Sequence, residues 1–247
     1  MPNDIVIQWM LEYTKIADDD LLVEIISMWH NLAKCYALEN QALPFSNDFL
    51  VPLQEVLCSK MCKPIEFGGD HNFYDEYAET LSLLIKMHYD DIFHLMIERM
   101  ETLQFGTDEM MNWVFSIGVV PGSCDEAVEA ELMSAIFSII LRYSNPNGNS
   151  EGGNAEGAPD QSIISMADAA FLYLAGQFTR YLLKNQQYFN LSLKKIEENI
   201  TGGQPEFQLV ALYSLKKIAI RCGKTLVATE FAQKLFQQFN EIIQQLP

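Results

Sequence analysis

The stretch Leu132–Tyr143, LMSAIFSIILRY, decides the fold class of this chain. Its apolar residues recur at intervals of three and four, which places them on one face of an α-helix. Similar stripes occur over residues 21–33 and 207–222. No stretch shows sustained two-residue alternation, and no Asn-Gly turn lies between strand-like runs, so the sequence predicts an all-α protein. The first stripe consists of Leu132, Ala135, Ile136, Ile139, Ile140 and Tyr143.

Capping residues and glycines divide the chain into successive helices. Asp18 and Thr107 can each cap a helix that starts with acidic residues, and Gly122 and Gly202 mark breaks. Short connections imply antiparallel neighbours, and pairs recurring about every 35–45 residues are typical of HEAT repeats. We therefore expect residues 1–247 to form a single HEAT-repeat α-solenoid, a superhelix of about five to six antiparallel helix pairs. The expected helices span 3–16, 19–39, 47–61, 71–87, 90–104, 108–119, 125–144, 161–183, 187–200, 206–222 and 225–245.

Residues 145–160 differ in composition from the rest of the chain. The segment reads NPNGNSEGGNAEGAPD and offers almost no apolar side chain to bury. We expect a flexible inserted loop, which chains tolerate because the entropy of loop closure grows slowly with length. A functional role for this loop stays open.

Composition limits the classes of partner. The 247 residues include 49% hydrophobic residues, enough for a buried core, and carry a formal net charge of −17. This charge repels phosphate backbones and anionic lipids, so we expect no direct nucleic-acid or membrane binding. Basic protein partners suit it better. The five cysteines are odd in number and scattered, which favours a soluble, reduced intracellular protein.

Motifs for catalysis or metal binding are weak. His88 and His94 are too far apart for a helical metal pair, and the pair formed by Cys58 and Cys62 has no second cysteine pair to complete a zinc site. Gly223-Lys224-Thr225 lacks the upstream glycine of a phosphate-binding loop. We therefore expect no enzyme activity, no cofactor and no metal site.

Several segments resemble, in order, the central part of exportins of the chromosome-region-maintenance type, which belong to the importin-β/karyopherin superfamily. The resemblance runs over roughly residues 5–230. It is carried by Val6-Ile7-Gln8-Trp9-Met10, the run from Asp20 to Trp29-His30-Asn31-Leu32-Ala33, Met61-Cys62-Lys63-Pro64, Glu79-Thr80-Leu81, Phe115-Ser116-Ile117-Gly118 with Gly122, Gly176-Gln177-Phe178-Thr179-Arg180-Tyr181-Leu182, and Lys217-Ile218-Ala219-Ile220-Arg221-Cys222.

This resemblance implies a segment of a nuclear transport receptor that shuttles between nucleus and cytoplasm. It would bind leucine-rich nuclear export signals of cargo proteins in an apolar groove between adjacent repeats, with Ran GTPase and nucleoporins as further partners. In such a groove an amphipathic helix buries its apolar anchors. Lys195 would restrain premature cargo or bind a peptide carboxylate. The groove positions that the resemblance implies are Ile136, Ile140, Tyr143, Asp168, Phe171, Leu172, Tyr181, Tyr188 and Lys195.

Three departures separate the chain from that family pattern. Tyr143 stands where the family often has a reactive cysteine, and Asp168 stands where a small apolar residue is usual. The family's long hairpin is reduced to residues 65–69, which weakens the expectation of Ran-gated release. Without the resemblance, the apolar groove positions are read equally well as core residues. The alternative function is a HEAT-repeat scaffold that assembles proteins without an export-signal groove.

Overall fold

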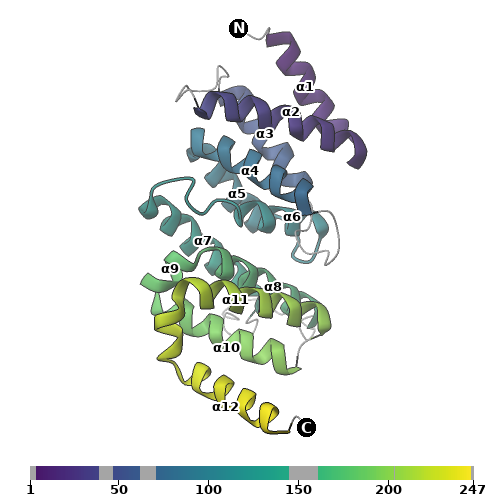
Figure 1. Cartoon of the computed structure of the whole chain (residues 1–247). Coiled ribbons are helices and arrows are strands. Elements are labelled where there is room, and N and C mark those ends of the chain that lie inside the picture. The colour runs from purple at the N-terminus through teal and green to yellow at the C-terminus, as the bar shows by residue number, and fades with distance from the viewer. Residues whose placement is uncertain (1–3, 39–46, 62–70, 145–160, 203, 246–247) are drawn as a thin grey trace, which may run out of the picture. The chain divides into compact units, whose positions relative to one another are not determined.

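Helices account for nearly all of the described chain. The computed structural model describes residues 4–38, 47–61, 71–144, 161–202 and 204–245, in which it contains twelve α-helices and no strand (Figure 1). The all-α class is therefore confirmed for these residues. The helices are α1 (Asp4–Ile16), α2 (Asp19–Leu38), α3 (Asn47–Lys60), α4 (His71–Met87), α5 (Asp90–Thr102), α6 (Asp108–Ile117), α7 (Glu126–Ser144), α8 (Gln161–Gln177), α9 (Thr179–Lys184), α10 (Gln186–Gly202), α11 (Pro205–Val227) and α12 (Glu230–Gln245).

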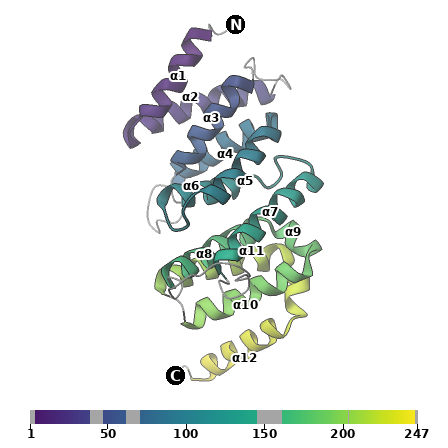
Figure 2. The same cartoon turned by 180° about the vertical axis from the view of Figure 1, so that it is seen from behind.

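The chain divides into two compact units, and the first is Met1–Ile136. In this unit α2 packs on α4, while α1 packs on α3 and α3 packs on α5 and α6. Figure 1 shows α2 and α4 on one face, and Figure 2 shows α3, α5 and α6 on the other. Contact between alternate helices is the pattern expected when amphipathic helix pairs stack side by side.

Buried polar side chains connect the helices of the first unit. The Nε1 group of Trp29, on α2, donates to Oγ1 of Thr14, on α1, at 3.0 Å, and the Trp29 side chain is fully buried. The Nε2 group of Gln54, on α3, donates to the carbonyl oxygens of Leu84 and His88 at the end of α4, both at 3.0 Å. These bonds fix the position of each helix along its neighbour, because a helix that slid along it would leave these buried donors without acceptors.

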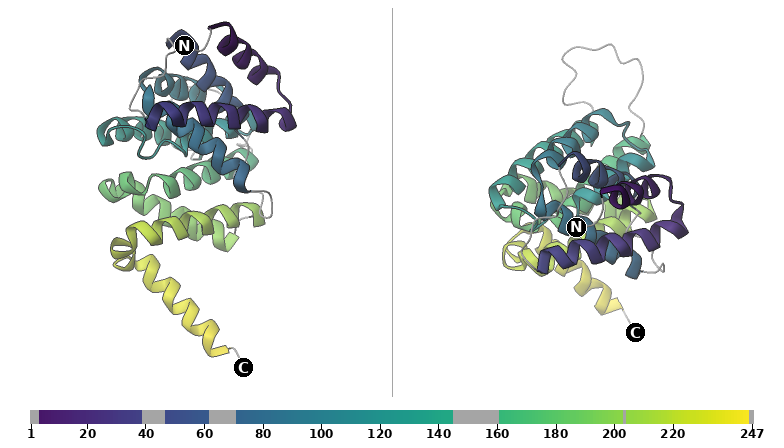
Figure 3. Two further views of the ribbon diagram at one scale, coloured as in Figure 1. Left: turned by 45° about the horizontal axis from the view of Figure 1, so that its top comes forward. Right: turned by 90° about the horizontal axis from the view of Figure 1, so that it is seen from above.

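The second unit is Phe137–Pro247. Its centre is the contact of α8 with α11, and α10 packs on both helices. The two helices approach closely at Gly176, where an added Cβ would meet Cα of Ser214 at 3.1 Å. The Ser214 hydroxyl donates to the carbonyl oxygen of Leu172 at 2.6 Å. The last helix, α12, extends from the end of α11 and contacts α10 and α11 (Figure 3).

The expected helix boundaries differ from the structure in two places. The helix expected over 161–183 is interrupted at Phe178, whose ψ of 45° is not helical, so α9 is a separate short helix. The helix expected to end at residue 222 has a kink there, since Cys222 has a non-helical φ of −110° and ψ of 16°, but a helical segment continues to Val227 and the last helix begins at Glu230 and not at residue 225. The expected caps are confirmed: Thr107 accepts from the N–H of Met110, and Asp18 accepts from that of Leu21.

Three expectations are not tested by the described residues. The inserted loop at 145–160 and the shortened hairpin at 65–69 lie outside the described residues. A single HEAT-repeat solenoid through residues 1–247 stays a prediction. In the part of the chain that the structure describes, every helix is too short or too polar to cross a membrane.

Candidate peptide-binding site

The predicted groove residues come from four successive helices. Eight of the nine lie in the second unit, and Ile136 is the last residue of the first. The carboxyl-terminal part of α7 carries Ile140 and Tyr143, α8 carries Asp168, Phe171 and Leu172, α9 carries Tyr181, and α10 carries Tyr188 and Lys195. The eight residues of the second unit make up the candidate site, here called the α7–α10 site.

A buried ion pair forms the polar part of the site. The Nζ group of Lys195 lies 2.5 Å from Oδ1 of Asp168, and the two side chains are only 6% and 15% exposed. Lys195 also donates to the Ser144 hydroxyl at 2.6 Å, and that hydroxyl donates to Asp168. The carboxylate at position 168, where a small apolar residue was expected, is therefore paired with a cation. This pairing offsets the unfavourable free energy of moving the charge out of water.

An aromatic cluster forms the apolar part of the site, with Phe137 of α7 at its centre. The ring centroid of Phe137 lies 4.8 Å from that of Phe171, 5.9 Å from that of Tyr181 and 5.1 Å from that of Tyr188. The Tyr181 and Tyr188 centroids are 5.8 Å apart. These separations lie in the range in which tilted aromatic pairs attract one another. α7 and α10 thus contact each other directly through Phe137 and Tyr188.

The apolar groove positions are closed to solvent in this structure. Ile140, Phe171 and Leu172 are fully buried, as is Ile136 in the first unit. Tyr143 and Tyr188 are half-buried and form the accessible edge of the site. A peptide that binds between α7 and α10 would have to separate the rings of Phe137 and Tyr188, which are in contact.

Sequence reasoning missed Phe137 and Ser144, the residues through which α7 joins the rest of the site. A signal for Phe137 was present, because Met133, Phe137 and Leu141 form a second apolar stripe beside the first. A helix that is apolar on more than one side packs against neighbours on more than one side. Ser144 gave no comparable signal, since a serine at a helix end is ordinarily read as solvent-exposed.

His88 and His94 each interact with a different nearby group. Nε2 of His88 lies 3.0 Å from Oδ2 of Asp91, and Nδ1 of His94 lies 2.8 Å from the carbonyl oxygen of Asp90. Among the described residues, no three His, Cys, Asp or Glu side chains are grouped as metal ligands.

The thiols of three described cysteines are poor nucleophiles. Burial raises the pKa of the Cys58 thiol to about 12, and burial together with the nearby Glu129 carboxylate raises that of Cys124 to about 11. Burial also raises the pKa of Cys222. Because the thiolate is the reactive form, these side chains are protonated and unreactive near neutral pH.

Comparison with known proteins gives a partial similarity to an exportin. No family model matches it. It is 22% identical over 178 residues to Exportin-1 of Dictyostelium discoideum, which covers 70% of this chain and 16% of that protein. The chain thus spans about a sixth of the length of this curated relative. The similarity supports a distant relation to part of an exportin.

Proposed function

We propose that this chain is a segment of an exportin-like transport receptor built from HEAT repeats, and that it binds an amphipathic export-signal helix at the α7–α10 site without catalysing a reaction. The observation that carries the proposal is the similarity to Exportin-1 over 178 residues. The contacts between alternate helices in the first unit agree with stacked repeats. Shuttling between nucleus and cytoplasm, with cargo proteins, nucleoporins and Ran GTPase as partners, belongs to the same proposal.

Binding at this site requires an exchange of apolar contacts. The peptide inserts leucine or phenylalanine side chains where the Phe137 and Tyr188 rings now meet, each contributing about 1.5–3 kcal/mol before ordering costs. Tyr188 is half-buried, so its ring can turn toward solvent with less loss than that of fully buried Phe171. The Asp168–Lys195 pair belongs to the same site and supplies its buried charges.

A binding assay with variants of α10 tests this proposal. Fluorescence polarisation with a labelled leucine-rich export-signal peptide should show saturable binding. Tyr188→Asp places a carboxylate at the accessible edge of the site and should weaken binding at least about tenfold, because an unpaired charge beside apolar anchors is unfavourable. Gln187→Asp is the matched control, since Gln187 is the exposed neighbour on the same helix. Equal affinity in both variants would remove the α7–α10 site from the proposal.

A scaffold without a peptide groove is the second candidate function. The full burial of Ile140, Phe171 and Leu172 favours it, because these residues already act as core. In this case partners dock on the acidic surface of a chain with net charge −17. Binding to basic proteins should then fall steeply between low and physiological salt, while the leucine-rich peptide fails to bind.

A further inference from the structure

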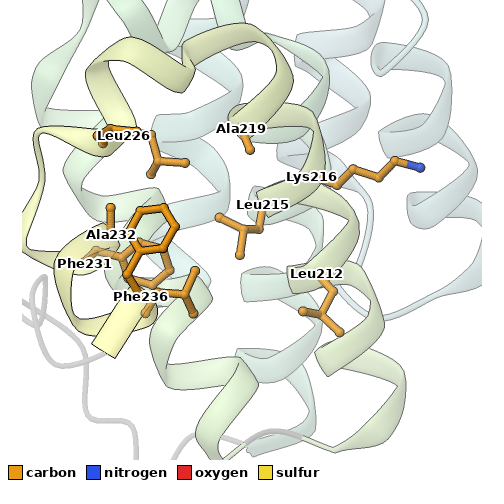
Figure 4. Close-up of a pocket in the computed structure, with 10 residues that line it drawn as sticks. Leu212, Leu215, Lys216, Ala219, Leu226, Phe231, Ala232 and Phe236 are labelled. Carbon is orange, nitrogen blue, oxygen red and sulfur yellow. The ribbon is translucent and has the colours of Figure 1, made fainter. Parts of the chain in front are cut away.

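An apolar pocket lies between α11 and α12, away from the α7–α10 site (Figure 4). Its volume is about 320 Å³. Figure 4 shows the rings of Phe231 and Phe236 on α12 facing the aliphatic side chains of α11. The residues that line this α11–α12 pocket are Leu212, Leu215, Lys216, Ala219, Leu226, Val227, Phe231, Ala232, Leu235 and Phe236.

Several of the large apolar side chains that line the pocket are exposed to solvent. Leu212 is 48% exposed, Val227 is 59% exposed and Phe236 is 57% exposed. Single exposed apolar residues are common on protein surfaces, but a contiguous group around a concavity marks a binding surface. The buried face of α11 explains why these side chains are left outside. Ser214 and Cys222 on that face bond to backbone carbonyl oxygens of α8 and α9, which fixes the orientation of the helix.

Positive charge borders the pocket, although the chain as a whole carries a net charge of −17. Lys216 is the one charged residue among the ten lining residues, and its ammonium points away from the apolar side chains in Figure 4. Within the part of the chain that the structure describes, no ion pair involves Lys216. The whole of α11 carries one acid, Glu206, and four bases, Lys216, Lys217, Arg221 and Lys224.

We propose that the α11–α12 pocket binds an acidic amphipathic helix of a partner protein. The apolar anchors of this helix enter the pocket, and a carboxylate on its border pairs with Lys216. An acidic partner fits because Lys216, the one charged residue of the pocket lining, is a base. This binding does not depend on the function proposed for the α7–α10 site.

The geometry of α11 indicates that the occupant is helical. Leu212, Leu215 and Ala219 lie three and four residues apart, so they form a stripe along the helix into which the anchors of a second helix pack. Addition of an extended peptide to a sheet edge requires a strand, and the described residues contain none. A helix also carries its acidic residues on one border of the apolar face, in register with a single lysine.

A charge-swap experiment tests this proposal. The probes are two fluorescein-labelled helical peptides with leucines one turn apart, one with glutamates and one with lysines on the flanking positions. The wild-type chain should bind the glutamate peptide at least about tenfold more tightly than the lysine peptide. Lys216→Glu should reverse this preference. Arg221→Glu is the matched control, because it makes the same charge change on the same helix outside the pocket lining.

Two further variants separate this site from the other one. Phe236→Asp should weaken binding of the glutamate peptide at least about tenfold, and circular dichroism should show an unchanged fold because Phe236 is exposed. Tyr188→Asp should leave this binding unchanged even if it abolishes export-signal binding. The proposal is overturned if Lys216→Glu keeps the wild-type preference, or if Tyr188→Asp abolishes binding while Phe236→Asp does not. Light scattering that shows a dimer dissociated by Phe236→Asp, with no peptide binding, would assign the pocket to a second copy and also overturn it.

Discussion

Asp168 and Lys195 form an ion pair inside the second unit. Their side chains are 15% and 6% exposed, and Ser144 bonds to both. Removal of one member leaves the other as an uncompensated buried charge, which is more unfavourable than removal of both. Each side chain therefore needs the other, because either one alone would be an unfavourable buried charge where α7, α8 and α10 meet.

We expect Lys195→Met to lower the free energy of unfolding by about 3–5 kcal/mol, because it leaves the Asp168 carboxylate buried without its cation. The double variant Asp168→Leu/Lys195→Met should recover most of this loss. Lys194→Met is the matched control and should change stability by less than about 0.5 kcal/mol, since Lys194 is exposed. Urea denaturation measures all three. A loss for Lys195→Met no larger than that of the control would mean that the pair is not buried in solution.

Cys58 makes stability depend on alkaline pH. Burial raises the pKa of its thiol to about 12 from an ordinary value of 9.0. The folded state holds the proton more tightly than the unfolded state, so the contribution is complete below pH 9 and declines as pH rises towards 12. The free energy of unfolding should fall by about 1.4 kcal/mol per pH unit in this window. Denaturation at several pH values should show a shallower slope for Cys58→Ala, and equal slopes would contradict this assignment.

Some residue-level features could be predicted from the sequence, and others could not. The caps at Asp18 and Thr107 depend on neighbours within one turn, so a local pattern was sufficient. The resemblance marked Asp168 and Lys195 as separate groove residues. Their bond depends on the register of α8 against α10, which no local pattern contains. For this reason Ser144, the third member of the network, was missed altogether.

At the scale of elements, the contact of α8 with α11 depends on a glycine. A Cβ at position 176 would lie 3.1 Å from Cα of Ser214, which is backbone and cannot rotate away. Ser214 is also held by its bond to the carbonyl oxygen of Leu172. A side chain at position 176 would therefore push the two helices apart.

Gly176→Ala should lower the free energy of unfolding by about 1 kcal/mol, because overpacking costs about 1–3 kcal/mol and the higher helix propensity of alanine returns up to about 1 kcal/mol. Gly202→Ala is the control, since a Cβ there meets nothing within 4 Å. This control should be neutral or slightly stabilising. Thermal unfolding followed by circular dichroism compares the two, and a stabilised Gly176→Ala variant would show that the contact between α8 and α11 is looser than described.

The two differences in helix boundaries have a tertiary cause. The apolar stripe ended at residue 222, where the structure has a kink, yet α11 continues to Val227 because Leu226 beyond the kink is buried and the Cys222 thiol bonds to the carbonyl oxygen of Thr179. Fully buried Phe178 is itself the interruption between α8 and α9. In both places packing against another helix overrides the local signal. The helical period predicted which elements exist, but their ends depend on contacts that are distant in sequence.

At the scale of the whole molecule, charge is distributed unevenly. The chain has 33 acidic and 16 basic residues, and four of those bases lie on α11. Excess negative charge disfavours a compact state through self-repulsion, while it helps solubility. At the α11–α12 pocket the one charged lining residue, Lys216, is positive, which the overall composition does not reveal. Composition predicted basic partners for the chain, whereas the α11–α12 pocket favours an acidic one.

Screening of this self-repulsion should stabilise the protein. Raising KCl from low to physiological concentration shortens the screening length to about 8 Å, so most repulsion between exposed carboxylates is lost. A gain of about 1 kcal/mol raises the Tm of a chain of this size by about 2–4 °C. Tetramethylammonium chloride should give the same shift, because screening depends on ionic strength and not on the cation. A Tm that falls with salt would mean that attractive pairs, such as Arg99 with Glu55, outweigh the net repulsion. A shift seen with KCl alone would indicate specific potassium binding.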